Sequence, residues 1–261
     1  MSDKTKKQRN GFIDNSVKPK AAAACIFFTV LAAAVFLPLI PVNAGSVYVE
    51  TGAGYKTGDF GSTVETRLVS VFTKVGYFTE HYELNIYAPY LFLRNETDAG
   101  HDMQSGFGDA VLRAGARLIG RTPNGYSLYG SASVKLPTAD PDKGLGTGEA
   151  DYGAFLTGSK RFDNVSLWVS GGGIITGDTP QQALNDLYYY DAGISRAFDR
   201  TQIYLSASGY REIVPDADAP ISANIGFFHI FSPRYSVRGA LQAGLSRGAP
   251  DYGISFSLIL R

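Results

Sequence analysis

A strict alternation of apolar and polar residues constrains the fold of this chain more than any other feature of its sequence. Near the C-terminal end, one face would carry Tyr252, Ile254, Phe256, Leu258 and Leu260, and the other Gly253, Ser255 and Ser257. A period of two places the two kinds of residue on opposite faces of a β-strand. Segments of about ten alternating residues, separated by turn residues, are typical of strands that cross a membrane in a β-barrel.

Twelve such segments follow one another, and their connections alternate in length. The strands are expected at residues 46–56, 62–75, 81–94, 107–120, 126–137, 150–162, 165–176, 187–198, 201–212, 220–231, 234–246 and 251–261. Short turns are expected near residues 79–80, 122–125, 163–164, 199–200 and 232–233, and longer loops at 57–61, 95–106, 138–149, 177–186, 213–219 and 247–250. Bacterial outer-membrane barrels combine an even strand number with short periplasmic turns and longer outer loops. We therefore predict an all-β fold, a transmembrane up-and-down antiparallel β-barrel of about 12 strands over residues 45–261.

The two faces of these strands differ in polarity, as they must in a barrel that crosses a membrane. One face is apolar in most segments, and the other carries Gly, Ser, Tyr, Asn and charged residues, so we expect the apolar face to meet lipid. Lys and Arg number 24 and Asp and Glu also 24, which gives no general field that would attract nucleic acid. The expected partners are outer-membrane lipid and lipopolysaccharide, and the barrel-assembly machinery during biogenesis.

Aromatic residues flank all five predicted short turns. They are Phe78, Tyr82, Tyr126, Phe162, Phe198, Phe231 and Tyr235. Amphipathic rings at a common depth indicate an aromatic girdle at the periplasmic interface. The alternative is that strand ends simply favour aromatic residues.

Pro89 conflicts with the otherwise regular third strand. Proline cannot donate a ladder hydrogen bond, and a closed barrel has no edge at which to hide it. A β-bulge is therefore expected beside Pro89.

The first 44 residues are predicted to be a signal peptide rather than part of the fold. Six basic residues precede an uncharged apolar run at 21–40, and Pro38 and Pro41 then lead to small residues ending at Ala44. This order is typical of a cleaved export signal, although twenty apolar residues could also remain as a membrane helix. Cleavage after Ala44 would remove Cys25, the single cysteine, and leave a mature chain without disulfides.

Twelve charged residues are predicted to face the lumen. They are Glu50, Glu65, Arg67, Glu83, Asp109, Arg113, Arg117, Lys135, Asp151, Arg161, Asp191 and Arg238. Charges inside a barrel must be paired or hydrated. They could form a structural network that stiffens a narrow lumen, or a polar constriction that selects solutes, and the two roles are compatible.

Strand register predicts two cross-strand ion pairs among these charges. Hairpin partners lie symmetrically about their loop, which places Glu83 opposite Arg117 near the periplasmic mouth. The same symmetry places Lys135 opposite Asp151 near the outer mouth. A one-residue slip would turn these charges toward lipid, which costs about 2–4 kcal/mol for a Lys or Arg at mid-depth.

Enzymatic and metal sites find little support in the sequence. A lipid hydrolase needs a His that can activate a Ser, and none of His81, His101 and His229 has a Ser two residues later. His229 is expected on the outward face, packed at the interface. His101 and Asp102 could touch a metal, but two ligands do not make a site, and no cofactor is expected.

Three short motifs in the middle of the chain resemble a known family. Residues 106–109 read GFGD, residues 135–140 read KLPTAD, and residues 144–148 read GLGTG before Asp151 and Tyr152. The last motif has no following helix, so it is not a nucleotide-binding loop. Together the motifs resemble the outer-membrane transporter family named for the meta-pathway of phenol degradation, whose second motif has Gly where Ala139 stands here. The resemblance implies a barrel that passes small, often aromatic or hydrophobic molecules.

The sequence therefore predicts an outer-membrane pore or transporter through which a small-molecule solute passes passively or by facilitated diffusion. Two alternatives remain at this stage: a barrel enzyme acting on lipid, and a plugged structural or adhesive barrel. Loops of only four to twelve residues argue against adhesion.

Overall fold

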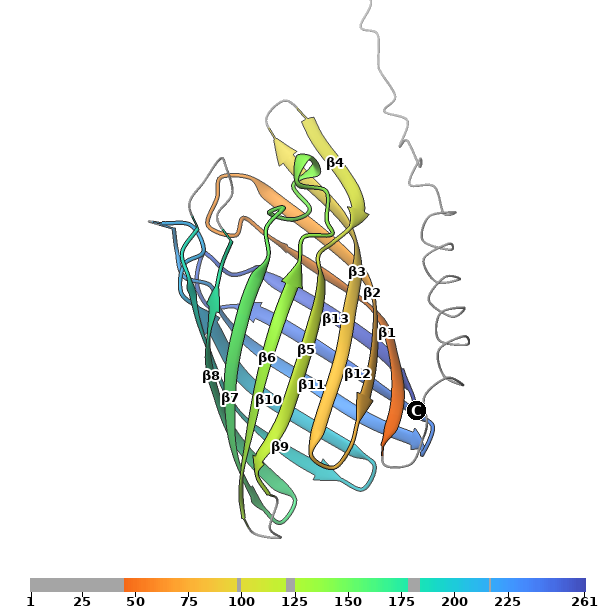
Figure 1. Ribbon diagram of the computed structural model, residues 1–261. Coiled ribbons are helices and arrows are strands. Elements are labelled where there is room, and N and C mark those ends of the chain that lie inside the picture. Colours follow the sequence, from red (N-terminus) through yellow and green to blue (C-terminus); the bar gives the residue numbers. More distant parts are fainter. Residues whose placement is uncertain (1–44, 98–99, 121–124, 178–183, 216) are drawn as a thin grey trace, which may run out of the picture.

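The computed structural model describes residues 45–261 except 98–99, 121–124, 178–183 and 216, so the predicted signal peptide lies outside the described residues. Within the described part of the chain, 13 strands form one antiparallel sheet (Figure 1). They are β1 (Ser46–Gly58), β2 (Glu65–Phe78), β3 (Tyr82–Thr97), β4 (Gly100–Phe107), β5 (Ala110–Ile119), β6 (Tyr126–Leu136), β7 (Asp151–Phe162), β8 (Val165–Ile175), β9 (Leu187–Phe198), β10 (Thr201–Tyr210), β11 (Ile221–Ser232), β12 (Tyr235–Gly244) and β13 (Tyr252–Leu260). A short 3-10 helix, η2 (Pro141–Lys143), lies between β6 and β7.

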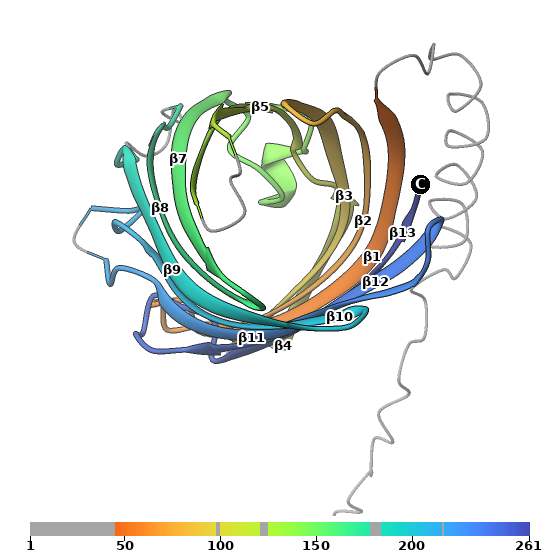
Figure 2. The ribbon, with the colours of Figure 1, turned by 90° about the horizontal axis from the view of Figure 1, so that it is seen from below.

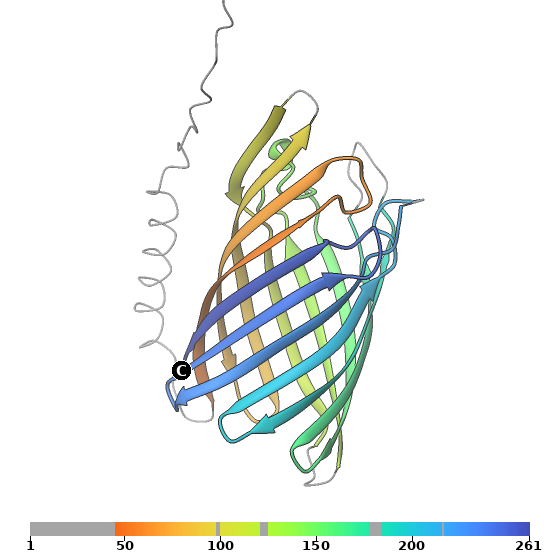
Figure 3. The same cartoon turned by 180° about the vertical axis from the view of Figure 1, so that it is seen from behind.

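The sheet closes into a barrel because β1 pairs with both β2 and β13. β3 pairs with β2 on one side and with β4 and then β5 on the other, so β4 and β5 together make one position in the ring. The barrel is therefore twelve-stranded, as predicted. Seen along the lumen the strands form a ring (Figure 2), and from the side they run steeply tilted (Figure 3).

Most strand boundaries lie within three residues of their predicted positions, but the region 95–106 differs. It was expected to be a polar loop, and instead β3 and β4 continue their pairing to Thr97 and Gly100. This hairpin rises beyond the rest of the rim (Figure 1). The polar side chains of this region favoured a loop. Strand pairing, however, uses only backbone N–H and C=O groups, so a hairpin outside the membrane can carry polar side chains on both faces.

The bulge expected beside Pro89 is present on the partner strand. Tyr90 pairs with Phe107 and Tyr87 with Val111, so two residues of β3 lie opposite three residues between those partners. The backbone N–H of Gly108 donates to the carbonyl of Pro89 at 3.0 Å. In an antiparallel ladder the N–H and C=O of one residue face the same neighbouring strand. Because the carbonyl of Pro89 faces Gly108, its nitrogen also faces that side, where β3 changes from pairing with β4 to pairing with β5. The absent N–H of Pro89 therefore lies at the interruption of the ladder.

Large apolar side chains cover the outer face of the barrel. About half of the surface of each side chain is exposed at five of these positions: Leu84, Leu156, Leu205, Ile225 and Phe256. These positions alternate with lumen-facing residues along their strands, as predicted. No helix among the described residues is long and apolar enough to cross a membrane.

The predicted aromatic girdle forms with one exception. Six of its seven members are exposed on the outer face near the short turns, namely Tyr82, Tyr126, Phe162, Phe198, Phe231 and Tyr235. Lys160 lies over the rings of Tyr126 and Phe162 at this level. Phe78 was assigned to the girdle wrongly, because it follows Lys74 and Gly76 on the lumen face of β2 and packs against Tyr48.

Candidate functional site: a charged and aromatic lumen

Ten of the twelve charged residues predicted to line the lumen do so. They are Glu50, Glu83, Asp109, Arg113, Arg117, Lys135, Asp151, Arg161, Asp191 and Arg238. Cavities of about 310, 400, 450 and 370 Å³ occur along the lumen between these side chains. Alternation within each strand fixes which residues enter the lumen, since neighbours along a strand point to opposite faces.

Glu65 and Arg67 were placed in the lumen wrongly. Leu68 faces the lumen beside Lys56, so Arg67 must face the other way. At the outer rim Arg67 lies 3.2 Å from Glu65 and 3.8 Å from Glu96. Outward charges are tolerated there because the rim lies beyond the hydrocarbon and its side chains are hydrated.

Three lumen cations were missed in the sequence. Lys56 and Lys74 occupy the lumen face of β1 and β2, and Arg261, after β13, lies over the lumen-facing ring of Phe78. The alternation indicated the two lysines, because each lies an even number of residues from other lumen-facing positions of its strand. With these three cations in place of Glu65 and Arg67, the described lumen set changes from six acidic and six basic residues to five acidic and eight basic.

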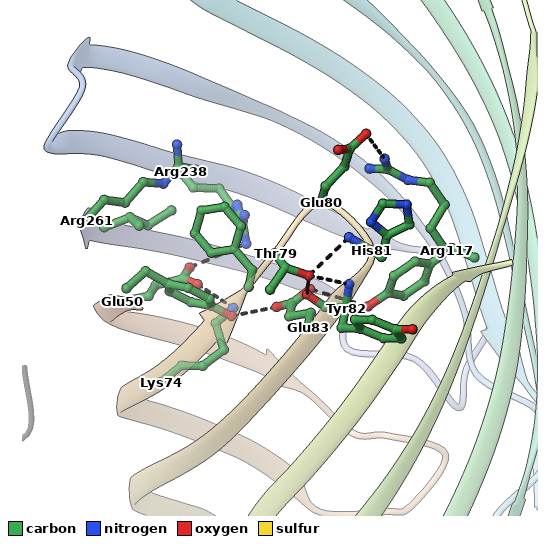
Figure 4. A pocket seen from close by; sticks show the side chains of 14 residues that line it. Glu50, Lys74, Thr79, Glu80, His81, Tyr82, Glu83, Arg117, Arg238 and Arg261 are labelled. Atoms are coloured by element: carbon green, nitrogen blue, oxygen red, sulfur yellow. Dashed lines mark hydrogen bonds and ion pairs between the residues drawn. The ribbon is translucent and has the colours of Figure 1, made fainter. Parts of the chain in front are cut away.

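A dense ionic cluster centred on Glu50 lies at the end of the lumen that carries the short turns (Figure 4). The Glu50 carboxylate lies 2.5 Å from the Lys74 Nζ and 3.4 Å from a nitrogen of Arg238, and it accepts a hydrogen bond from Ser257. Its side chain is only 4% exposed. These contacts join β1 to β2, β12 and β13, so the cluster ties the closing seam of the barrel from inside.

The predicted ion pair between Glu83 and Arg117 does not form. Glu83 lies opposite Gly115, two residues away from the predicted register, and Arg117 instead reaches Glu80 in the turn at 4.0 Å. The predicted symmetry assumed a loop centred near residue 100, whereas Thr97 pairs with Gly100, three residues from the predicted register. The extra residue opposite Pro89 restores one of these three, which leaves a net shift of two. Both side chains still face the lumen because a shift of two preserves the face.

Glu83 is held by neutral groups instead of a cation. Its carboxylate accepts hydrogen bonds from the Tyr48 hydroxyl at 2.7 Å, from the Asn85 amide at 3.1 Å and from the Tyr129 hydroxyl at 3.5 Å. These donors come from β1, β3 and β6. The tyrosine of β1 thereby reaches over β2 to a carboxylate on β3.

The predicted pair between Lys135 and Asp151 is confirmed. The two residues are direct cross-strand partners, and Lys135 Nζ lies 2.8 Å from the Asp151 carboxylate. Lys135 Nζ also lies 3.6 Å from Asp109 and donates to the Thr147 hydroxyl at 2.9 Å. One ammonium group therefore joins β6, β7, the start of β5 and the loop at 138–149.

These contacts clamp the outer loop and account for the three sequence motifs. Asp109, from the first motif, accepts the backbone N–H of Ala139 at 2.9 Å. Thr138 donates to the carbonyl of Gly108 and accepts the N–H of Ala110. Gly146, in the third motif, leaves no room for a side chain, because a Cβ there would lie 2.6 Å from that of Ala139. The motifs thus form one anchor, and the loop that carries η2 turns over the lumen (Figure 2).

Aromatic side chains line much of the lumen wall, which the sequence analysis did not single out. Lumen-facing positions carry Tyr48, Phe72, Tyr87, Tyr129, Phe155, Trp168, Tyr189, Tyr204, Tyr210 and Phe228. Several contact each other or a cation, such as Phe155 with Tyr189 at a centroid distance of 5.9 Å. The alternation indicated this placement, because each aromatic residue lies an even number of positions from the polar or small residues that face the lumen on its strand.

Hydrolytic and metal chemistry find no assembled site among the described residues. His229 faces outward, its Nδ1 lies 2.8 Å from the Thr201 hydroxyl, and its ring packs on Phe231. The neighbouring backbone N–H groups belong to the ladder on both sides, which leaves none to stabilise an oxyanion. No group of three His, Cys, Asp or Glu side chains in the described part of the chain could hold a metal.

Solved structures share this architecture at low sequence identity. An outer membrane channel from Pseudomonas putida F1 aligns with a TM-score of 0.63 and 15% identity over 85% of this chain and 96% of that one. The β domain of the Bordetella autotransporter BrkA aligns at 0.54, with 11% identity over 84% and 99%. The KdgM porin aligns at 0.51, with 9% identity over 81% and 98%. These likenesses support the barrel fold.

No curated protein matches the sequence. The model of the family described as "Putative MetA-pathway of phenol degradation" matches residues 48–261, which is the whole of the barrel from the third residue of β1 onward. The chain therefore belongs to this family, as the three motifs of the outer loop and its anchor predicted.

Proposed function

We propose that this protein is an outer-membrane pore through which small molecules diffuse, with residues 1–44 acting as the export signal. The observation that carries the proposal is the contrast between the two faces of one closed sheet. The outside is apolar and ringed by aromatic residues, and the inside holds charges, hydroxyls and cavities. Water-filled or solute-filled interiors are the reason for a polar inner face in a membrane barrel.

The outer loop supports a selective pore rather than a wide one. Twelve strands enclose a lumen that side chains can largely fill, and the loop at 138–149 turns over its outer mouth (Figure 2). The Lys135–Asp109–Asp151 anchor fixes that loop in place. A fixed inward loop narrows the passage to small solutes and brings them against charged and aromatic side chains.

The structural neighbours support the same class of activity. The Pseudomonas protein is an outer membrane channel, and the KdgM porin has been solved in complex with oligogalacturonate.

Single-channel recording tests the proposal directly. Purified protein inserted into planar lipid bilayers should give discrete conductance steps, and proteoliposomes should swell in isotonic arabinose. A plugged structural barrel would give neither signal while still migrating as a folded, heat-modifiable band. Release of fatty acid from phospholipid by the same preparation would favour the lipid-acting enzyme instead.

A further inference from the structure

We infer that the lumen contains a binding site for a small aromatic carboxylate, formed by Arg113 and the rings of Phe155, Tyr189 and Tyr210. This inference rests on the proposed pore function and specifies its solute. The four side chains come from β5, β7, β9 and β10 and line one cavity of about 450 Å³ beneath the clamped outer loop. That volume is in the range of pockets that enclose small organic ligands, about 300–1,000 Å³.

Arg113 is a lumen cation that lacks a carboxylate partner. Among the described residues no Asp or Glu oxygen lies within ion-pair distance of it, in contrast to Lys74, Arg117, Lys135 and Arg238. Its guanidinium carbon instead lies 5.4 Å from the centre of the Phe155 ring. A guanidinium stacked on a ring keeps its N–H donors available at its edge, where a planar carboxylate binds through two oxygens.

The other charged side chains at this cavity already have partners. Lys135, at its outer end, is shared between Asp109 and Asp151. Asp191, on the neighbouring wall, accepts the indole N–H of Trp168 at 2.5 Å. Of the three charged residues that line the cavity, Arg113, Lys135 and Asp151, only Arg113 has no ion-pair partner among the described residues, so its N–H donors are the groups there that can receive a carboxylate.

Three rings next to Arg113 favour an aromatic anion over an aliphatic one. Phe155 meets Tyr189 edge to face at a centroid distance of 5.9 Å, and Tyr189 lies 5.2 Å from Tyr210. Edge-to-face and offset stacking add about 0.5–1.5 kcal/mol per aromatic pair beyond the burial of apolar area. A ring bound beside Phe155 would extend this row, while its carboxylate would reach Arg113.

Titration calorimetry on the detergent-solubilised barrel tests the site with three probes. Benzoate has the ring and the charge, cyclohexanecarboxylate has the charge without the aromatic ring, and benzyl alcohol has the ring without the charge. Benzoate should bind more tightly than either. Arg113→Gln should weaken benzoate binding about tenfold, the size expected for one charged hydrogen-bonded contact, and should leave benzyl alcohol unchanged. Phe155→Leu should bring benzoate and cyclohexanecarboxylate to similar affinities.

Arg117→Gln is the matched control, because Arg117 lies on the same strand and the same face but is paired with Glu80. It removes the same lumen charge and should preserve the preference for benzoate. Arg113→Lys retains the charge without the bidentate geometry and should recover part of the affinity, provided that each variant still shows heat-modifiable migration. Equal loss of benzoate binding in Arg113→Gln and Arg117→Gln would overturn the site, and so would equal binding of the three probes to the unmodified protein.

Swelling of proteoliposomes in arabinose keeps this test separate from that of the pore. Arabinose entry without a benzoate preference would overturn the aromatic carboxylate site and leave the pore intact. Selective benzoate binding without any solute entry would support the site and overturn the proposed passage through the lumen.

Discussion

Lys135 on β6 lies directly opposite Asp151 on β7, and their charged atoms are 2.8 Å apart inside the outer mouth of the barrel. The Lys135 side chain is 20% exposed and that of Asp151 16%, so the pair is largely shielded from water. Shielded pairs lose much stability when one partner is removed, because the other charge is left uncompensated. This relationship makes the pair both a marker of strand register and a support for the outer loop.

Reversal of the charge at Lys135 should release the loop at 138–149. Lys135→Glu would place three carboxylates together, with Asp109 and Asp151, and break the contact to Thr147. We expect a loss of about 3 kcal/mol or more in the free energy of unfolding. Single-channel recording should show larger and less steady conductance. The control is Lys143→Glu, which changes an exposed pair with Asp140 in the same loop and should leave stability within about 1 kcal/mol. Identical conductance in the two variants would contradict the clamp.

A methyl group at Gly146 should have a similar effect without any change of charge. A Cβ at this position would lie 2.6 Å from that of Ala139 and 2.7 Å from the Asp109 carboxylate. Gly146→Ala should therefore displace the loop from its anchor, cost about 1–3 kcal/mol and raise cleavage of the loop by added protease. Gly158→Ala is the comparison, since a Cβ there meets nothing within 4 Å. Equal protease resistance of the two variants would argue against a close-packed anchor.

Removal of the Glu50 carboxylate should weaken the closing seam of the barrel. Glu50→Ala leaves Lys74 and Arg238 facing each other without their shared anion. The expected loss is about 3–5 kcal/mol, measured by urea unfolding of the protein refolded into lipid vesicles. Glu65→Ala removes an exposed rim carboxylate and should cost at most about 1 kcal/mol. A loss at Glu50 no greater than at Glu65 would show that the seam does not depend on this cluster.

Labelling of intact cells should place the two ends of the barrel on opposite sides of the outer membrane. Asp142 lies in the outer loop and Asn164 in the short turn between β7 and β8, and both are exposed. A Cys at Asp142, in a background with Cys25→Ala, should react with a membrane-impermeant maleimide on whole cells. A Cys at Asn164 should react only after the outer membrane is opened. The reverse pattern would mean that the barrel is inserted the other way round.

Processing of the precursor should expose Gly45 as the first residue. The motivation is the basic leader, the apolar run and the small residues ending at Ala44. Edman sequencing of protein recovered from the outer-membrane fraction tests this. A product that retains residues 21–40 and fractionates with the inner membrane would refute both the cleavage site and the export route.

The sequence by itself determined the class of fold, the number of strand positions and the face of nearly every strand. These depend on one local rule: side chains alternate across a strand, and lipid accepts only apolar ones on the outer face. The same rule placed Lys135 and Asp151 correctly, because the ladder between β6 and β7 contains no bulge. The same alternation also places Lys56, Lys74 and the lumen aromatics on the inner face, although they were not among the predicted lumen residues.

Only the tertiary structure decided the register beyond the bulge and the partners of each lumen charge. The extended β3–β4 hairpin displaced the register by three residues, and the extra residue opposite Pro89 returned one of them, which left Glu83 two positions away from the expected partner, Arg117. The ion pair of Glu50 with Arg238 and the contacts of Phe155 with Arg113 and Tyr189 join strands that are not consecutive in the chain. Closure of the ring and the lean of long side chains over intervening strands bring such residues together, and a pattern read along one strand at a time carries no information about that distance.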